Sequence, residues 1–140
     1  MFTLQETPID TAQAKNSHCT STDGALVSFE GIVRSDKHTG KEVRSLLYIA
    51  EQGPCMTEGE KIVNEAYSLF SLPHALCIQR IGNVPAGQTA IWIGAWSAHR
   101  DEAFKACRYI IEETKKRLHI WKKEYFTDGT SAWVPGSYKL

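Results

Sequence analysis

Three lysines near the end of a predicted helix are the first residues whose surroundings favour chemistry. Lys115 lies within the helix, and Lys122 and Lys123 follow in HIWKKEYF, residues 119–126, among bulky apolar side chains. A lysine held beside apolar walls and other cations has a lowered pKa and can then give or take a proton. The alternative for each lysine is a solvated cation whose methylenes cover apolar surface.

The spacing of these lysines limits which of them can share a site. At 100° per residue, Lys115 lies about 20° from Phe104, at the edge of the apolar stripe of its helix. If residues 119–126 form a strand, Lys122 and Lys123 point to opposite faces. Only one of them can enter a site that contains Lys115, and both faces carry large apolar residues, so periodicity leaves open which one.

Further cationic residues stand at the ends of two predicted strands. His99 and Arg100 lie where a strand passes into the long helix, and helix N-termini bind anions through free N–H groups and a positive dipole. Arg34 ends an earlier strand. Each of the three could equally be a solvated charge, so each signal is weak when taken singly.

Other catalytic and ligand-binding patterns are missing from the sequence. Cys107 lies on the apolar stripe, where a small buried residue is expected rather than an activated nucleophile. The chain has no GxSxG motif and no glycine-rich phosphate loop. Neither the cysteines nor the histidines show the spacing of metal ligands, so no metal site is predicted.

Length and composition indicate one domain of 140 residues. Sixteen basic residues balance sixteen acidic ones, so nothing in the overall charge favours nucleic acid or an anionic membrane as a partner. No apolar stretch approaches the ~18 residues of a membrane span, and the first residues lack the pattern of a secretory signal. We therefore expect a cytoplasmic protein in which Cys19, Cys55, Cys77 and Cys107 are reduced thiols.

Five extended segments and two helices are predicted to position the candidate residues. Residues 1–23 are polar and weakly patterned, which suggests one short element and a loop. Strands are predicted at 24–34, 43–51, 75–82, 89–98 and 119–126. The first two strands are expected to pair as a hairpin. Helices are predicted at 57–70, with Thr57 and Glu60 as a capping box, and at about 100–118.

The pattern of apolar residues indicates how these elements pack. The strand at 89–98 is apolar on both faces and should lie centrally in a sheet. One stripe of the long helix is predicted to face the core: Phe104, Cys107, Ile111, Thr114 and Leu118, broadened by Ala103 and Ile110. The order β-β-α-β-β-α-β predicts an α+β fold, with a mainly antiparallel sheet packed against two principal helices.

Several segments, read together, resemble the large, catalytic subunit of molybdopterin synthase. GALVSFEGIVR, residues 24–34, is similar to the family's first-strand signature, which ends in a functional arginine. SAHRDEAFKACRYIIEETKKRLHIWKKE, residues 97–124, is similar to its most diagnostic segment, and QRIGNVPAGQTAIWIG and DGTSAWV also fit. The resemblance implies an α/β hammerhead-like fold and a single catalytic-subunit domain over 1–140, with 1–23 variable and 135–140 a short tail.

The resemblance also implies a reaction and its partners. The family transfers sulfur from the C-terminal thiocarboxylate of a small ubiquitin-like sulfur-carrier subunit to cyclic pyranopterin monophosphate, forming the dithiolene of molybdopterin in molybdenum cofactor biosynthesis. The carrier's tail, which ends in glycine, threads into the large subunit. Two large subunits form the central dimer of a heterotetramer. No cofactor is implied, because the pterin is the substrate.

Particular residues acquire roles through the same resemblance. The two catalytic lysines correspond to Lys115 and Lys122, which selects Lys122 over Lys123. The implied substrate-binding residues are Ile32, Val33, Arg34, His99, Arg100, Lys115, Lys122, Lys123 and Glu124. The cationic residues of this set suit a reaction in which a phosphate and a thiocarboxylate meet. We expect Lys115, Lys122, Arg34 and Arg100 to converge on one cleft. Gly53 stands where the family usually has a tyrosine.

Two other functions agree with the same residues. A non-catalytic binding protein could hold a ubiquitin-like tail or a pterin phosphate in this cleft without turning anything over. An unrelated small α+β enzyme could act on a phosphorylated metabolite without any ubiquitin-like partner.

Overall fold

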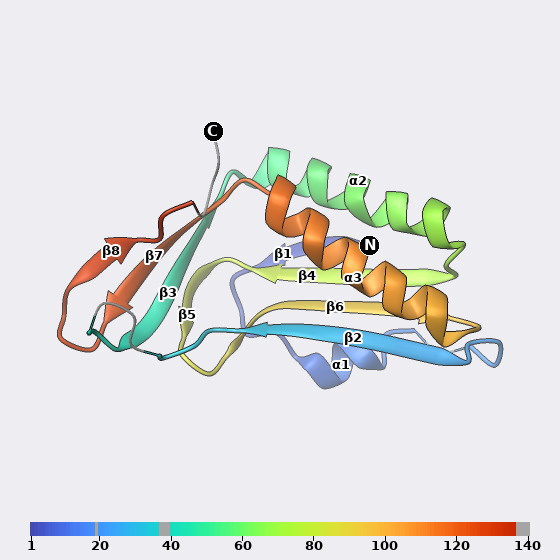
Figure 1. Ribbon diagram of the computed structural model, residues 1–140, viewed down its shortest axis with the longest axis horizontal. Helices are drawn as coiled ribbons and strands as arrows, with labels where there is room; N and C mark the ends of the chain where they lie inside the picture. The colour runs from blue at the N-terminus through green and yellow to red at the C-terminus, as the bar shows by residue number, and fades with distance from the viewer. Residues whose placement is uncertain (19, 37–39, 137–140) are drawn as a thin grey trace.

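The described residues form two four-stranded sheets and two long helices (Figure 1). The computed structural model describes residues 1–18, 20–36 and 40–136. The first sheet has the strand order β1 (Phe2–Gln5), β4 (His74–Arg80), β6 (Thr89–Ser97), β2 (Ala25–Ile32). The second sheet has the order β5 (Gly82–Pro85), β3 (Val43–Ala50), β7 (Ile120–Phe126), β8 (Ser131–Trp133). Strand β1 runs parallel to β4, and the other strand pairs among the described residues are antiparallel, so the predicted α+β class is confirmed.

The strand pairing differs from the predicted hairpin. Strand β2 pairs with β6, and β3 pairs with β5 and β7 in the other sheet, so the predicted pairing of 24–34 with 43–51 is wrong. After a bulge between Gly31 and Ile32, Val33 still bonds to the β6 side: its N–H donates to the Gln88 carbonyl, and its own carbonyl accepts from the Gly87 N–H. The chain therefore leaves the first sheet only after Val33, and β3 begins a second sheet.

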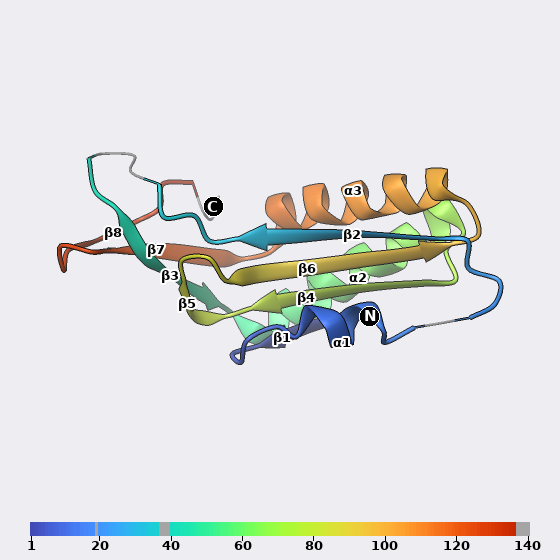
Figure 2. The same cartoon turned by 90° about the horizontal axis from the view of Figure 1, so that it is seen from below.

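Helices α2 (Gln52–Phe70) and α3 (Arg100–Arg117) cover one face of the first sheet, and the short α1 (Thr11–Lys15) lies on the opposite face (Figure 2). Alternate side chains of the central strand β6 pack on opposite faces of the first sheet. Ile93 packs into the large core under α2 and α3, whereas Trp92 packs with Ala14 of α1. The predicted central place of 89–98 is confirmed by this two-sided burial.

The N-terminal segment contributes more than the predicted short element and loop. Strand β1 adds to the first sheet beside β4, and Phe2 is only 1% exposed. The backbone N–H of Phe2 donates to the Glu60 carboxylate at 2.8 Å. Glu60 therefore binds β1 rather than capping a helix. Helix α2 begins at Gln52, with Glu51 at the N-cap position, so the capping box predicted at Thr57 is wrong.

Gly59 of α2 allows Phe2 to pack against the helix. A Cβ atom built on Gly59 would collide with the Phe2 ring, whereas one built on Gly53 of the same helix meets nothing within 4 Å. We expect Gly59→Ala to lower the free energy of unfolding by about 2 kcal/mol, because overpacking outweighs the better helix propensity of alanine. Gly53→Ala is the matched control and should be neutral or stabilising in urea denaturation. Equal stability of the two variants would contradict this packing.

The buried face of α3 is rotated slightly from the predicted stripe. Ala103, Cys107, Ile110 and Thr114 are buried as predicted, but Phe104 is 61% exposed. The buried side chains of α3 lie on both sides of a line through Ala103 and Ile110. Phe104 follows Ala103 in the sequence and therefore points about 100° away from it around the helix. Lys115 lies on the same side of α3 as Phe104, next to the edge of the core.

Candidate active site

A cavity of about 530 Å³ lies where the end of α3 meets both sheets. Its walls come from the end of β2, the last turns of α3, strands β3 and β7, and the segment after β8. The charged residues among its described lining are Arg34, Asp36, Lys115, Lys122 and Glu124. Ile111, Leu118 and Ile120 supply part of an apolar wall. The cavity therefore combines cations with a partly desolvated surface.

Lys115 and Lys122 both line this cavity from different elements. Lys115 stands in the last turn of α3, and Lys122 lies within β7. The Nζ atom of Lys122 is 5.7 Å from the ring centroid of Tyr48. Burial lowers the pKa of Lys122, and the positive charge of Lys115 lowers it further. Lys122 therefore gives up its proton more readily than an exposed lysine does.

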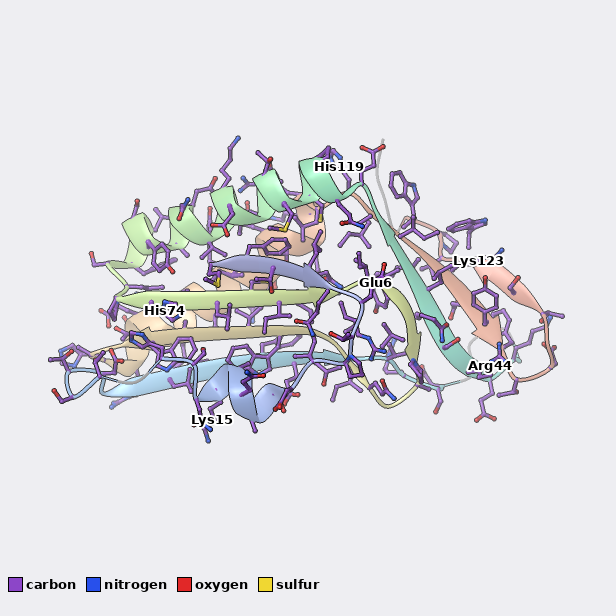
Figure 3. The ribbon with its side chains drawn as sticks, turned by 180° about the vertical axis from the view of Figure 1, so that it is seen from behind. Glu6, Lys15, Arg44, His74, His119 and Lys123 are labelled. Atoms are coloured by element: carbon purple, nitrogen blue, oxygen red, sulfur yellow. The ribbon has the colours of Figure 1, made fainter. Side chains whose placement is uncertain are left out.

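Lys123 lies on the other face of β7, as strand alternation requires. Its Nζ atom is 5.4 Å from the Trp133 ring centroid and 5.6 Å from that of Tyr125. Among the described residues that line the cavity, Lys123 is absent. Figure 3 shows it among the side chains of the second sheet. The structure thus places Lys122, and not Lys123, beside Lys115.

The end of β2 supplies the rim of the cavity. Ile32, Val33 and Arg34 all line it, with Val33 buried and the Arg34 side chain 82% exposed. The Nε atom of Arg34 is 3.5 Å from the Asp36 carboxylate. Glu124 lines the cavity from β7 and is 7% exposed. The exposed Arg34 side chain therefore lies at the mouth of the cavity, paired with Asp36.

His99 and Arg100 do not reach this cavity within one chain. They lie at the start of α3 and are exposed. Arg100 precedes Lys115 by 15 positions in the helix, a separation of about 22 Å. The first turn of α3 also carries Asp101 and Glu102, which compete with an anion for the helix N-terminus. The expected convergence of Arg34 and Arg100 on one cleft is therefore not found in a single copy, because an 18-residue helix separates the two ends.

Tyr48 and Gln79 are among the cavity residues that the sequence reasoning missed. Tyr48 is the cross-strand partner of Lys122 in the β3–β7 register, and burial raises its pKa to about 12. Gln79 reaches the cavity from β4 and is 6% exposed. The alternation of β3 could have suggested Tyr48 if β7 had been recognised as its partner. No sequence signal marked Gln79.

The described cysteines are not nucleophiles. Cys55, Cys77 and Cys107 are free and buried. Burial raises the pKa of Cys107 to about 11, which disfavours the thiolate. Cys19 lies outside the described residues. Within the described ranges no cluster of three or more His, Cys, Asp or Glu could hold a metal ion, and no helix has the length and apolarity needed to cross a membrane.

Comparison with known proteins identifies the family. The family model described as MoaE protein matches residues 4–117, which is most of the chain. The chain belongs to the MoaE family. The family expected from the sequence is thus confirmed.

Two relatives of this MoaE-family chain show what it is similar to in sequence. The molybdopterin synthase catalytic subunit of Synechococcus elongatus is 42% identical over 115 residues, covering 81% of this chain and 69% of the relative. That of Pyrococcus abyssi is 40% identical over 116 residues, covering 83% of this chain and 77% of the relative. The predicted enzyme class, a molybdopterin synthase catalytic subunit, is confirmed at this level.

Solved structures agree with the fold of the MoaE-family chain. The crystal structure of molybdopterin synthase from Staphylococcus aureus superposes with a TM-score of 0.87 at 30% identity and covers 94% of both chains. A chain from a complex of subunits 1 and 2 of the Helicobacter pylori molybdopterin-converting factor gives a TM-score of 0.79 over 96% of this chain and 90% of that one. Because the Helicobacter pylori chain is only 21% identical to this one, its similarity supports the fold alone.

Proposed function

We propose that this MoaE-family chain transfers sulfur from the C-terminal thiocarboxylate of a small ubiquitin-like subunit to cyclic pyranopterin monophosphate in the cytoplasm. The observation that carries the proposal is the shared cavity of Lys115, Lys122 and Arg34. The substrate brings a cyclic phosphate and the donor brings a thiocarboxylate, so two anions must approach each other. In a partly apolar cavity such an approach is unfavourable unless fixed cations compensate it.

The two lysines have different roles in this proposal. Lys115 contacts the donor's C-terminal glycine and moves a proton or stabilises the acyl intermediate, the thioester that forms when the thiocarboxylate sulfur attacks the pterin. Water then cleaves this thioester, which leaves the sulfur on the pterin and releases the carrier with a C-terminal carboxylate. Lys122 stabilises the charge that develops on the pterin side when the phosphate oxygen leaves. Its lowered pKa supports such a role, since a proton held weakly beside the leaving oxygen is transferred readily. Arg34 at the mouth offers planar donors for the phosphate.

His99 and Arg100 can complete the cavity from a second copy of the chain. Strand β2 is an edge strand, with Ala25 opposite Ser97 near the start of α3 and Ile32 opposite Thr89 near the cavity. The eight residues of β2 span about 23 Å, close to the separation of Arg100 from Lys115 along α3. A two-fold axis across the middle of β2 therefore brings Arg100 of one copy to the cavity of the other.

Exposed apolar side chains on this edge support a dimer contact there. Phe29 and Ile32 of β2 and Phe104 of α3 are all exposed in a single copy. Contact between two copies would cover them and join each α3 start to the neighbouring cavity. The proposed assembly is a dimer of this chain with one small subunit bound at each cavity.

Mixing two inactive variants tests whether Arg100 acts across the dimer. Arg100→Ala homodimers should lose at least about tenfold in turnover, and Lys122→Ala homodimers at least about 100-fold. After exchange of subunits, each heterodimer contains one cavity with both residues intact, so the mixture should recover about a quarter of wild-type activity. If Arg100 acts within its own chain, mixing restores nothing. Size-exclusion chromatography of tagged and untagged copies confirms that exchange has occurred.

A binding experiment tests whether the cavity receives a peptide tail. The chain should bind a small ubiquitin-like subunit that ends in Gly-Gly at least about tenfold more tightly than the same subunit lacking those two residues. Lys115→Ala should reduce the ratio of these two affinities, because Lys115 lines the cavity and is proposed to contact the C-terminal glycine of the donor. Equal affinity for both forms would favour an unrelated enzyme that acts on a phosphorylated metabolite without a tail-bearing partner.

A further inference from the structure

Gln79 presents a buried polar group to the cavity that the sulfur-transfer chemistry does not use. It lies in β4 opposite Ile91 of β6, and both residues line the cavity. With 6% of its surface exposed, Gln79 is largely desolvated, and its carboxamide can meet only the sheet or a group inside the cavity. A polar side chain buried in this way requires hydrogen-bond partners.

The amide nitrogen of Gln79 is fully engaged by the sheet. Nε2 donates to the Arg80 carbonyl at 2.9 Å and to the Ala90 carbonyl at 3.1 Å. These two contacts use both N–H groups and fix the orientation of the carboxamide, since a flipped amide would direct oxygen at two carbonyl oxygens. The side chain therefore has one preferred orientation, set by backbone groups that cannot move independently.

The carboxamide oxygen is left for the cavity. Among the described residues no donor bonds to Gln79 Oε1, although an amide oxygen can accept two hydrogen bonds. The charged side chains Arg34, Lys115 and Lys122 around the cavity are donors and suit the anionic parts of a substrate. Asp36 is already placed 3.5 Å from Arg34 at the rim. Gln79 adds a neutral, fixed acceptor on the first sheet.

From this geometry we infer that Gln79 is a specificity-determining residue whose Oε1 accepts a hydrogen bond from a ring N–H or amino group of the substrate's pterin. The inference rests on the proposed function, which supplies a substrate with a phosphate at one end and N–H donors on its ring system. In this arrangement the cations bind the phosphate, and Gln79 Oε1 recognises the pterin ring through a hydrogen bond. A neutral acceptor can do this without weakening the attraction between the cations and the phosphate.

Gln79→Met tests this inference through substrate affinity. The variant removes the acceptor and keeps a side chain of similar length. It should raise the Kd for cyclic pyranopterin monophosphate, measured by calorimetry, about tenfold, the effect of losing one neutral hydrogen bond. The inhibition constant of inorganic phosphate should stay within about twofold, because phosphate contacts the cations and not Gln79. A general disturbance of the cavity would weaken both ligands together.

Gln79→Ala provides a second variant if Gln79→Met does not fold. Its small side chain adds no charge, leaves the Ala90 and Arg80 carbonyls open to the cavity and accepts no hydrogen bond, so the ratio of the pterin Kd to the phosphate inhibition constant should again rise about tenfold. An unchanged ratio in a folded variant, with wild-type protein active, overturns the role of Gln79 alone. If the wild-type protein neither binds nor converts the pterin, the proposed function fails and this inference fails with it.

Discussion

Lys122→Ala and Lys115→Ala are each expected to lose at least about 100-fold in sulfur-transfer turnover while remaining folded. The reason is electrostatic: both amines line the same cavity, and removing a charge aimed at a developing anion typically costs two to three powers of ten in rate. Turnover is measured with thiocarboxylated small subunit and cyclic pyranopterin monophosphate at saturating concentrations. Thermal unfolding of each variant verifies the fold.

Lys123→Ala is the matched control for this experiment. It removes an adjacent lysine of the same strand, but one whose ammonium lies over Trp133 and Tyr125 outside the cavity. Its turnover should stay within about threefold of wild type, since the Lys123 side chain lies on the face of β7 opposite Lys122 and does not line the cavity. The assignment of Lys115 and Lys122 as catalytic residues is refuted if both of their alanine variants keep near-normal turnover. It is also refuted if Lys123→Ala loses as much turnover as they do.

Arg117→Met is expected to lower the free energy of unfolding by about 2 kcal/mol at neutral pH, the effect of breaking charged hydrogen bonds in a half-buried site. Arg117 ends α3 and holds it to α2: Nε lies 2.7 Å from the Glu58 carboxylate, and Nη1 lies 2.7 Å from the Glu65 carboxylate. Nη1 also donates to the Glu113 carboxylate within α3. Without the guanidinium, three carboxylates remain close together and repel one another.

The pH dependence of this stability difference tests whether the ion pairs of Arg117 cause it. Hydrogen bonds from Arg117 and Tyr109 lower the pKa of Glu65 from 4.5 to about 2. A carboxyl group with a lowered folded-state pKa contributes stability that is present above pH 4.5 and is lost as the pH falls toward 2. The difference between wild type and Arg117→Met should therefore shrink across this window in urea denaturation. Arg108→Met, which removes an exposed partner of Glu112, is the control and should change stability by less than about 0.5 kcal/mol. A difference that is the same at all pH values would exclude the ion pairs as its cause.

Side-chain periodicity predicted the parts of the site that depend on one element. The helix period placed Lys115 at the edge of the core, where it meets the cavity. Strand alternation required Lys122 and Lys123 to face opposite ways, as they do. The period alone could not choose between them, and the choice came from resemblance to the family. Both inferences use local geometry, which the sequence of one segment determines.

Contacts between elements were predicted poorly. Alternating residues show which faces of a strand are buried, but they do not show its neighbour, and so β2 and β3 were wrongly paired. Tyr48 reaches Lys122 only through the β3–β7 register, which that error concealed. Gln79 reaches the cavity through the pairing of β4 with β6. Sheet topology depends on contacts distant in sequence, and a single sequence records these weakly.

Phe104 and Arg100 show a further limit of prediction from one chain. An apolar residue at the edge of a helix stripe was expected to be buried, yet Phe104 is exposed in the single copy. Arg100 was expected in the same cleft as Arg34, yet α3 keeps it at the far end. Both departures lie on the face that we propose for the dimer. Apolar residues that contact a second copy follow the same periodicity as core residues, so one sequence does not distinguish the two kinds of burial.

Turnover by the wild-type protein tests the central claim most directly. The purified chain is mixed with thiocarboxylated small subunit and cyclic pyranopterin monophosphate, and the product is followed by mass spectrometry. A sulfur-transfer enzyme should form a product that carries two new sulfur atoms, with two thiocarboxylates consumed for each product molecule. If the chain binds both partners but forms no such product, the cavity only holds its ligands and the catalytic roles of Lys115 and Lys122 are refuted.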